Sequence, residues 1–412
     1  MTLISQWGLK IKKMVQPIRK EVREANPELT KKVSYTLLID GQNLLLISAN
    51  GDKERVNSNG EKIGGIFQFL IQMKKLLKLY NFDNVYVVWD GKLSGKLRYD
   101  LYPEYKLNRG KDYERELATT DYQKELDAFV RRTLKYYKGK KNQSDIEKSC
   151  KDKFDDSEDI RRQKKCIIEY LEELYIRQLW DDGKEEVEGD DLIAYYCKTK
   201  RPDEKIVIAS GDRDLTQLIN EDIAIYIPIM NKFIHIRNYR QYFDIYHENI
   251  ALLKILCGDS SDNIKGIKGL GEKTVINIMP EIQERKVTLE EFLERTANLK
   301  EERIKNKKKP ILVYDNILNR VTEGCQKEKI YEINEKIINL KTPLMNERTL
   351  ELFEEVIGAP ISPENRGLHN LQKLIKRDGI TDLMDENRFV GFFAQFQEII
   401  TKEIKFYKKC LE

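Results

Sequence analysis

The stretch YTLLIDGQN, residues 35–43, decides the fold. An apolar run ends in an aspartate and is followed by Gly-Gln-Asn, which is typical of a buried strand entering a turn. VYVVWD (85–90) repeats this design, and IVIAS (206–210) repeats it again before GDRD. Between the first two runs, GGIFQFLIQMKKLLKLY (64–80) has apolar residues at helical spacing. The order strand, helix, strand predicts a parallel α/β sheet.

The rest of the chain reads mainly as helices. Residues 160–181 and 188–200 are predicted helices, and the chain after residue 280 reads as helices joined by polar loops. KNKKK (305–309) is most simply a solvated basic loop. NRFVGFFAQFQEIITKEI (387–404) is an amphipathic element, for which core packing is favoured over binding to a partner.

Composition limits the class of protein. The chain has 412 residues, enough for one large core or two domains, and 40% of them are hydrophobic, as in a globular enzyme. Three histidines argue against histidine-based chemistry, and six cysteines without a C-x-x-C pair argue against a zinc ribbon. No run would cross a bilayer and no signal peptide is visible, so we expect a cytoplasmic protein without a membrane partner.

Charge must be segregated locally if this protein binds nucleic acid. The formal net charge is only +4, although 34% of the residues are charged. Carboxylates follow the ends of the predicted strands, and open α/β sheets place their sites at that edge. Two further segments, EGDD (188–191) and GDSSDNIKGIKGLGEKT (258–274), add more acids. The nine candidates are Asp40, Asp90, Glu188, Asp190, Asp191, Asp212, Asp214, Asp259 and Asp262.

Any single one of these acids is better explained as a helix N-cap. Nine together are different, because like charges in partly buried sites raise one another's pKa and oppose ionisation. Divalent cations with oxygen ligands relieve that repulsion, and Mg²⁺ binds through few carboxylates, its own waters and a substrate phosphate. The set therefore favours two-metal hydrolysis of a phosphodiester bond.

Six motifs resemble, in order and approximate spacing, those of the 5′-nuclease or flap endonuclease family. They are DGQN (40–43), WDG (89–91), PEYKLNR (103–109), EGDD (188–191), SGDRD (210–214) and GDSSDNIKGIKGLGEKT (258–274). The likeness covers roughly residues 34–280. It is strongest to the bacterial and phage branch, which includes 5′–3′ exonucleases, nuclease domains of bacterial DNA polymerases and phage ribonuclease H.

The resemblance implies a PIN-like α/β nuclease core with a helical arch and a helix–three-turn–helix (helix-hairpin-helix) module. We expect a basic extension (1–33), a core (34–230) with the arch at about 110–187, a duplex-binding region (231–345) and a C-terminal helical extension (346–412). Basic clusters in RRTLKYYKGKK (131–141), with Tyr136 and Tyr137, and in RRQKK (161–165) suit a grip on single strands. For any one of these lysines, a solvated charged face is the alternative.

The resemblance also implies roles for the acids. Asp40, Asp90, Glu188, Asp190 and Asp191 match ligands of the more catalytic metal, and Asp212 is shared. Asp214, Asp259 and Asp262 match the second, looser group. The expected cofactors are two Mg²⁺ ions, with Mn²⁺ as a substitute, and a monovalent cation at the helix-hairpin-helix. Gly189, where alanine is usual, and Trp89, where phenylalanine is usual, should not disturb the site.

PEYKLNR is the second predicted constellation. Tyr105 is expected to stack on a base, and Lys106, Arg109 and the upstream Arg98 are expected to meet the scissile phosphate. The resemblance gives Lys106 the stabilisation of transition-state charge. The simpler alternative is that Lys106 and Arg109 only counter nearby acids.

The glycine–lysine segment nearly matches a P-loop, but Glu272 intervenes before Lys273 and Thr274, which argues against an NTPase. As a hairpin between helices, its glycines let backbone approach a phosphate of duplex DNA and its lysines add attraction. The predicted contacts are Lys265, Gly266, Lys268, Gly269, Gly271, Lys273 and Thr274.

Together these features predict a Mg²⁺-dependent, structure-specific 5′ nuclease in replication or repair. Its expected partners are branched or nicked duplex DNA and RNA–DNA hybrids, with a single-strand-binding protein or sliding clamp as candidates, and it is expected to be a monomer. One alternative is a catalytically silent branched-DNA-binding protein, which the complete acidic set opposes. The other is a PIN-type ribonuclease on RNA alone, which the duplex-suited hairpin opposes.

Overall fold

The computed structural model describes residues 33–91, 93–109, 126–127, 129–131, 133, 143–179, 186–322, 325–326 and 329–411. The predicted basic extension at 1–33, apart from Val33, lies outside the described residues. So does most of the first part of the arch, including Tyr136 and Tyr137.

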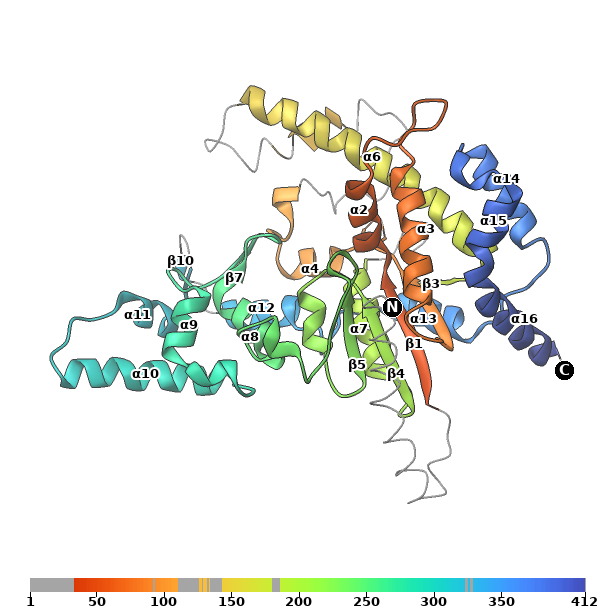
Figure 1. The fold of residues 1–412 in the computed structure, drawn as a ribbon. Coiled ribbons are helices and arrows are strands. Elements are labelled where there is room, and N and C mark those ends of the chain that lie inside the picture. Colours follow the sequence, from red (N-terminus) through yellow and green to blue (C-terminus); the bar gives the residue numbers. More distant parts are fainter. Residues whose placement is uncertain are drawn as a thin grey trace, which may run out of the picture.

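A central sheet has the strand order β3-β2-β1-β4-β5-β6, in which β6 alone runs antiparallel to its neighbour (Figure 1). Its strands are β1 (Ser34–Asp40), β2 (Asn84–Val88), β3 (Arg177–Leu179), β4 (Glu204–Ala209), β5 (Ile223–Ile227) and β6 (Lys232–Ile234). The predicted parallel α/β sheet is confirmed, with YTLLID at its middle.

Strand β3 corrects the predicted helix 160–181. The helix α6 (Gln143–Glu173) stops where Tyr175 takes a left-handed backbone conformation (φ 59°), which ends a helix. The chain then pairs Arg177–Leu179 with β2.

Alternation along β1 divides the apolar core into two layers, because successive side chains of a strand point to opposite faces. Leu37 and Ile39 lie in the layer covered by α2 (Gly41–Gly51), α3 (Gly64–Leu77) and α6. Leu38 lies in the other layer. The helices α7 (Gly189–Thr199) and α13 (Glu347–Gly358) cover that face.

The ends of β1 and β2 form one tightly packed unit. Asp40 caps α2 by accepting a hydrogen bond from the Asn43 amide, so the helix begins directly after the strand. A Cβ on Gly41 would lie 2.7 Å from the Trp89 ring, so only glycine fits there without a shift. Trp89 is fully buried and stacks on Phe69 with ring centroids 5.7 Å apart. Trp89 therefore keeps this side of the sheet edge apolar.

A helix–hairpin–helix follows the sheet. It consists of α8 (Ile250–Cys257), the short strands β7 (Gly258–Asp259) and β8 (Ile264–Lys265), and α9 (Glu272–Ile278). The helices α10 (Leu289–Lys305), α11 (Leu312–Leu318) and α12 (Ile330–Ile338) join it in a second apolar core. We call residues 264–322 the arm, because α9, α10 and α11 project from the sheet at the left of Figure 1.

Gly266 has a packing role, and its predicted contact with a phosphate stays a prediction. A Cβ there would lie 2.0 Å from the carbonyl carbon of Cys257, so the end of α8 touches its backbone. Gly269, with φ 77°, and Gly271 have nothing within 4 Å of such a Cβ, so their backbone is open to a ligand.

The C-terminal helices cover α3 and α6 at the right of Figure 1. They are α14 (Leu368–Arg377), α15 (Glu386–Phe393) and α16 (Gln397–Leu411). Phe389, Phe393, Phe396 and Ile400 are buried in the same core as Leu37, so the core-packing interpretation of 387–404 is confirmed. Among the described residues, no helix has both the length and the apolar composition needed to cross a bilayer.

Candidate active site

Carboxylates from separate loops interact at the C-terminal edge of the sheet. Burial raises the pKa of Asp40 to about 7, and the charges of Asp90 and Asp212 push it the same way. Burial also raises the pKa of Asp190 well above its ordinary value, and Asp212, Asp40, Asp90 and Glu188 add to that effect. The structure therefore brings together five acids predicted from strand ends and from EGDD. We call Asp40, Asp90, Glu188, Asp190 and Asp212 the first acidic group.

Donors from neighbouring loops orient this group. Asp40 accepts hydrogen bonds from the Asn43 amide at 2.9 Å and from the Ser210 hydroxyl at 2.8 Å. Asp90 accepts one from the Gly189 amide at 2.8 Å. The carboxylates thus have fixed directions set by the backbone of α2 and α7.

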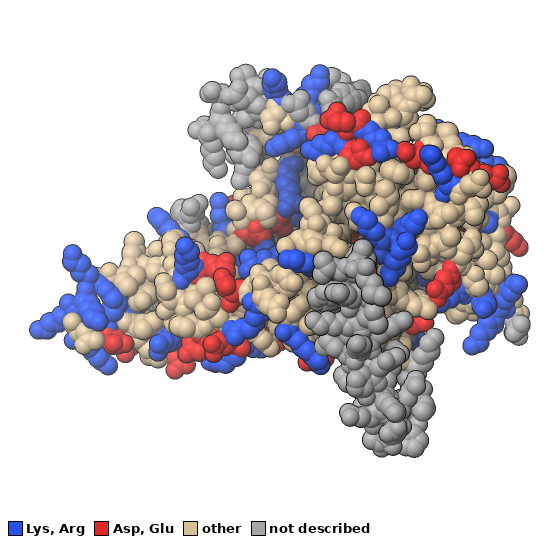
Figure 2. Space-filling view, in the orientation of Figure 1, with Lys and Arg blue, Asp and Glu red and all other residues tan. Residues whose placement is uncertain are grey.

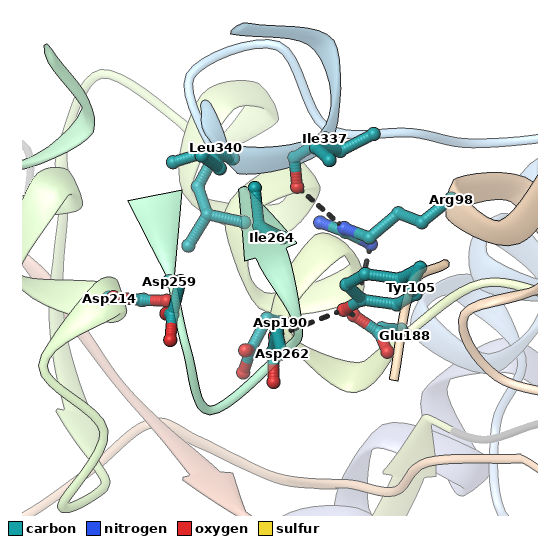
Figure 3. Close-up of a pocket in the computed structure, with 11 residues that line it drawn as sticks. Arg98, Tyr105, Glu188, Asp190, Asp214, Asp259, Asp262, Ile264, Ile337 and Leu340 are labelled. Atoms are coloured by element: carbon teal, nitrogen blue, oxygen red, sulfur yellow. Dashed lines mark hydrogen bonds and ion pairs between the residues drawn. The ribbon is translucent and has the colours of Figure 1, made fainter. Parts of the chain in front are cut away.

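Arg98, on α4 (Lys96–Leu101), is a buried partner of these acids. Its guanidinium pairs with Asp191. It also lies 3.1 Å from Glu188 and donates to the Ile337 carbonyl at 2.8 Å (Figure 3). The side chain of Arg98 is 6% exposed and that of Asp191 is 1% exposed. Arg98 is thus buried against acids, although it also lines the pocket described below, and its contact with a substrate phosphate stays a prediction.

Asp191 is likewise occupied. One of its oxygens accepts hydrogen bonds from Arg98 and from the Leu344 amide, the latter at 2.9 Å. The Asp191 carboxylate is therefore buried against Arg98 and the Leu344 amide, and Arg98 lies between it and Glu188 of the first acidic group.

Tyr105 does not stack on a base in this structure, which corrects the prediction. Tyr105 is 1% exposed, and its hydroxyl lies within hydrogen-bond distance of Glu188, at 2.8 Å, and of Asp262, at 3.3 Å (Figure 3). Lys106 has a left-handed backbone (φ 52°), and its ammonium pairs with Glu188 and lies 3.8 Å from Asp262. Burial lowers the pKa of Lys106, but Glu188 and Asp262 outweigh burial and raise it, so Lys106 stays charged near neutral pH.

The PEYKLNR segment is fastened to the loop that carries Asp262. The Lys106 amide donates to the Asp262 carbonyl at 2.9 Å. Asn108 donates to two carbonyls of residues 260–261, at 3.2 and 3.1 Å. Arg109 pairs with the Asp262 carboxylate and donates to the Ser261 carbonyl. Backbone and side-chain hydrogen bonds therefore join the two motifs, which lie more than 150 residues apart in sequence.

A second acidic group shares one lysine that the sequence did not single out. Lys254 of α8 pairs with Asp214 and lies 2.6 Å from Asp259. Burial raises the pKa of Asp214 to about 6 in spite of Lys254. Burial also acts upward on Asp259, but hydrogen bonds from Lys254 and Ser261 overcome it and hold its pKa at about 2. The only signal for Lys254 is a lysine inside an otherwise apolar helix, IALLKILC.

Lys164 is the other cation that sequence reasoning missed. It belongs to RRQKK, predicted as part of a single-strand grip, yet its ammonium donates to the Asp90 carbonyl at 2.6 Å and lies over the Trp89 ring. The C-terminal half of α6 thus contacts the segment that follows strand β2.

The residues predicted to contact duplex at the hairpin form a separate set, which is exposed in part. Lys268, Gly269, Gly271 and Lys273 are exposed, whereas Lys265 and Thr274 are half-buried. The Lys268 amide donates to the Val321 carbonyl at 2.9 Å, which fixes the hairpin loop against the short strand β9 (Val321–Thr322).

The donor set fits a hard divalent cation, although within the described part of the chain no three His, Cys, Asp or Glu side chains are arranged to chelate one. Buried carboxylates with raised pKa values and oxygen-only ligands are the chemistry that Mg²⁺ and Mn²⁺ stabilise. A pocket lies between the groups, lined by Tyr105, Glu188, Asp190, Asp214, Asp259 and Asp262 among others (Figure 3).

The family model of the 5′–3′ exonuclease N-terminal resolvase-like domain matches residues 35–246, just over half of the chain. This chain belongs to that 5′-nuclease family. A 5′–3′ exonuclease of Mycoplasmopsis pulmonis is 26% identical over 83% of this chain and 91% of its own length. DNA polymerase I of Thermus caldophilus is 25% identical over 69% of this chain, which spans only 28% of that polymerase.

Solved structures show the same fold. The bacteriophage T5 5′-exonuclease with bound zinc matches with a TM-score of 0.51 at 17% identity, covering 83% of this chain and 97% of its own. A T5 flap endonuclease variant in a pseudo-enzyme–product complex with DNA and metal ions matches equally well. At this identity the likeness supports the fold alone, and with the family match the protein is a hydrolytic nuclease.

Metal should stabilise this protein more at high pH than at low pH. A raised carboxyl pKa means that the folded state holds protons that the unfolded chain has lost, so metal-free stability falls as pH rises from about 4 to about 7. A bound divalent cation removes this loss of stability at high pH, because it neutralises the ionised carboxylates. At low pH the cation must compete with protons for the same carboxylates. Mg²⁺ should therefore raise the Tm more at about pH 8 than at about pH 5.5. Thermal unfolding with Mg²⁺ or EDTA measures this.

The control is Asp40→Asn, which cannot ionise and should show a smaller difference between the two pH values. Equal Mg²⁺ shifts at both pH values in the unaltered protein would contradict the prediction.

Proposed function

We propose that this protein is a Mg²⁺-dependent, structure-specific 5′ nuclease of DNA replication or repair. It would cut phosphodiester bonds near the 5′ ends of branched or nicked duplex DNA and of RNA strands in RNA–DNA hybrids. One observation carries the proposal: the PEYKLNR segment is hydrogen-bonded to residues 260–263. These bonds fix the position of the hairpin, which would bind duplex, relative to the acids.

The first acidic group would hold one divalent ion, and Asp214, Asp259 and Asp262 would hold a second. Ions bound there would activate a water and neutralise charge on the reacting phosphate. Asp191 would act from behind, since Arg98 ties it to Glu188 and so sets the direction of that carboxylate. The relatives named as exonucleases, and a T5 neighbour described with DNA and metal ions, support this assignment.

Lys106 would stabilise the transition state. Its side chain is 13% exposed, so the ammonium is nearly enclosed, and it pairs with Glu188, which lines the pocket. The left-handed backbone and the bond to the Asp262 carbonyl hold it in place before substrate binds. A preorganised donor of this kind costs no reorganisation when charge develops. Arg109, half-exposed and paired with Asp262, would take a neighbouring phosphate.

We extend the proposal to the chain's organisation. Residues 34–230 would be the nuclease core with its arch, residues 231–345 the duplex-binding region, and residues 346–412 a helical extension. The second apolar core around α8, α10 and α12 supports the division. A monovalent cation at the hairpin, Mn²⁺ as a substitute, action as a cytoplasmic monomer, and a single-strand-binding protein or sliding clamp as partner remain predictions.

Cleavage assays test the function directly. Labelled 5′-flap DNA, nicked duplex, RNA–DNA hybrid and single-stranded RNA are offered with Mg²⁺ or EDTA. We expect metal-dependent cleavage of the branched and hybrid substrates. Lys106→Ala should lower the rate about 10²–10³-fold by removing one positioned donor. Asp212→Asn removes a predicted metal ligand and should raise the Mg²⁺ concentration that cleavage requires. No cleavage by the unaltered protein would refute the enzyme, and cleavage of single-stranded RNA alone would favour the ribonuclease alternative.

The hairpin lysines should govern affinity rather than chemistry. Lys268→Ala and Lys273→Ala should weaken binding to nicked duplex and lower the salt dependence by about 0.9 per lost phosphate contact. Cleavage at saturating substrate should stay near that of the unaltered protein. Lys373→Ala on α14 removes the same charge elsewhere and serves as the control. Unchanged affinity and salt dependence in the hairpin variants would contradict this role.

A further inference from the structure

The connection between α10 and α11 carries a basic cluster that the proposed function has not used. We call Lys305, Lys307, Lys308 and Lys309 the basic tip; all four are exposed. Residues 301–309 contain five cations against two acids, Glu301 and Glu302. Within the described part of the chain, no carboxylate pairs with any of the four tip ammonium groups. Figure 2 shows blue side chains gathered over this end of the arm.

The basic tip is a defined turn. Lys307 has a left-handed backbone (φ 52°), its amide donates to the Ile304 carbonyl, and the Lys308 amide donates to the Arg303 carbonyl at 2.9 Å. The Arg303 guanidinium then donates to the Lys309 carbonyl at 3.1 and 2.8 Å. Helices usually place glycine at such a position, because a side chain there is strained. Lys307 thus has a strained backbone where glycine would be relaxed, and its side chain adds a positive charge to the tip.

The tip lies within a short distance of the hairpin. Asn316 on α11 donates to the Lys268 carbonyl at 2.9 Å, so α11 touches the hairpin loop. Three extended residues from Lys309 to the start of α11 span at most about 11 Å, and four helical residues to Asn316 add about 6 Å. The Cα of Lys309 is therefore no more than about 17 Å from the Cα of Asn316, the residue that contacts the hairpin loop.

This upper limit on the separation is the length of a few base pairs of duplex. Phosphates along one strand of DNA are about 3.4 Å apart along the axis, so about 17 Å corresponds to about five base pairs. A duplex held at Gly269 and Lys268 that runs along the arm would bring its next phosphates to the basic tip.

We propose that the basic tip is a second, sequence-independent contact for the duplex DNA held at the hairpin. This inference rests on the proposed function. It deepens that function, because affinity then depends on how far the duplex extends past the hairpin. A shorter duplex would be held by the hairpin alone.

The test compares the unaltered protein with the triple variant Lys307→Gly/Lys308→Ala/Lys309→Ala. Affinity for nicked substrates is measured by fluorescence anisotropy in EDTA, over a ladder of downstream duplex lengths. For the unaltered protein, affinity should first level off once the duplex is long enough to fill the hairpin site. We then expect a second rise in affinity when the duplex is longer by up to about five base pairs. The variant should lack that rise, show a salt dependence smaller by about 0.9 per lost contact, and match the unaltered protein on short duplexes.

Two controls keep the result interpretable. Lys373→Ala/Lys376→Ala/Lys405→Ala removes three exposed lysines from the C-terminal helices and should leave the length dependence intact. Lys307→Gly alone should leave the Tm unchanged or higher, because glycine relieves the left-handed position. Equal affinity and salt dependence of the triple variant and unaltered protein on long duplexes would overturn the inference. Cleavage of short substrates tests the proposed function independently of the tip.

Discussion

Repulsion among the carboxylates at the C-terminal edge of the sheet is the constraint on which the rest of the structure depends. Burial drives the pKa of Asp40 to about 7 and that of Asp190 well above its ordinary value, so the edge resists ionisation unless cations are near. The chain supplies some of them itself: Arg98 behind Asp191, Lys106 beside Glu188 and Lys254 between Asp214 and Asp259. The remaining repulsion is what a divalent ion would relieve, so the metal demand follows from the packing.

In the proposed function, the same cations connect the acidic site to the segment that would bind duplex DNA. Lys254 belongs to α8, the first helix of the hairpin module, and Lys106 is bonded through its backbone to the Asp262 loop. The open glycines Gly269 and Gly271 lie directly beyond that loop in sequence. A duplex held on the arm would therefore be held at a fixed distance from the acids. Acidic and basic residues are neighbours in this segment because it connects the two tasks.

Much of the fold could be predicted from the sequence, and the site could be predicted in part. Strand ends such as Asp40 and Asp90 are predictable because an apolar run followed by an acid and glycine is typical of a buried strand that enters a turn. The burial of Tyr105 and Arg98 was not predictable, since their partners lie far away in the chain and residue type alone suggests a phosphate contact. Strand β3 was missed because a left-handed Tyr175, which no composition rule predicts, ends the helix before it. Lys254 and Lys164 were missed because a lysine in a helix is ordinarily a solvated one.

The most direct measurement of the central claim is anomalous diffraction from crystals soaked in Mn²⁺. The account predicts an anomalous peak among Asp40, Asp90, Asp190 and Asp212, and a strong loss of that peak in Asp190→Asn. A second, weaker peak is expected near Asp214 and Asp262. An absence of peaks at this edge of the sheet, or a peak that Asp190→Asn leaves at full height, would contradict the account.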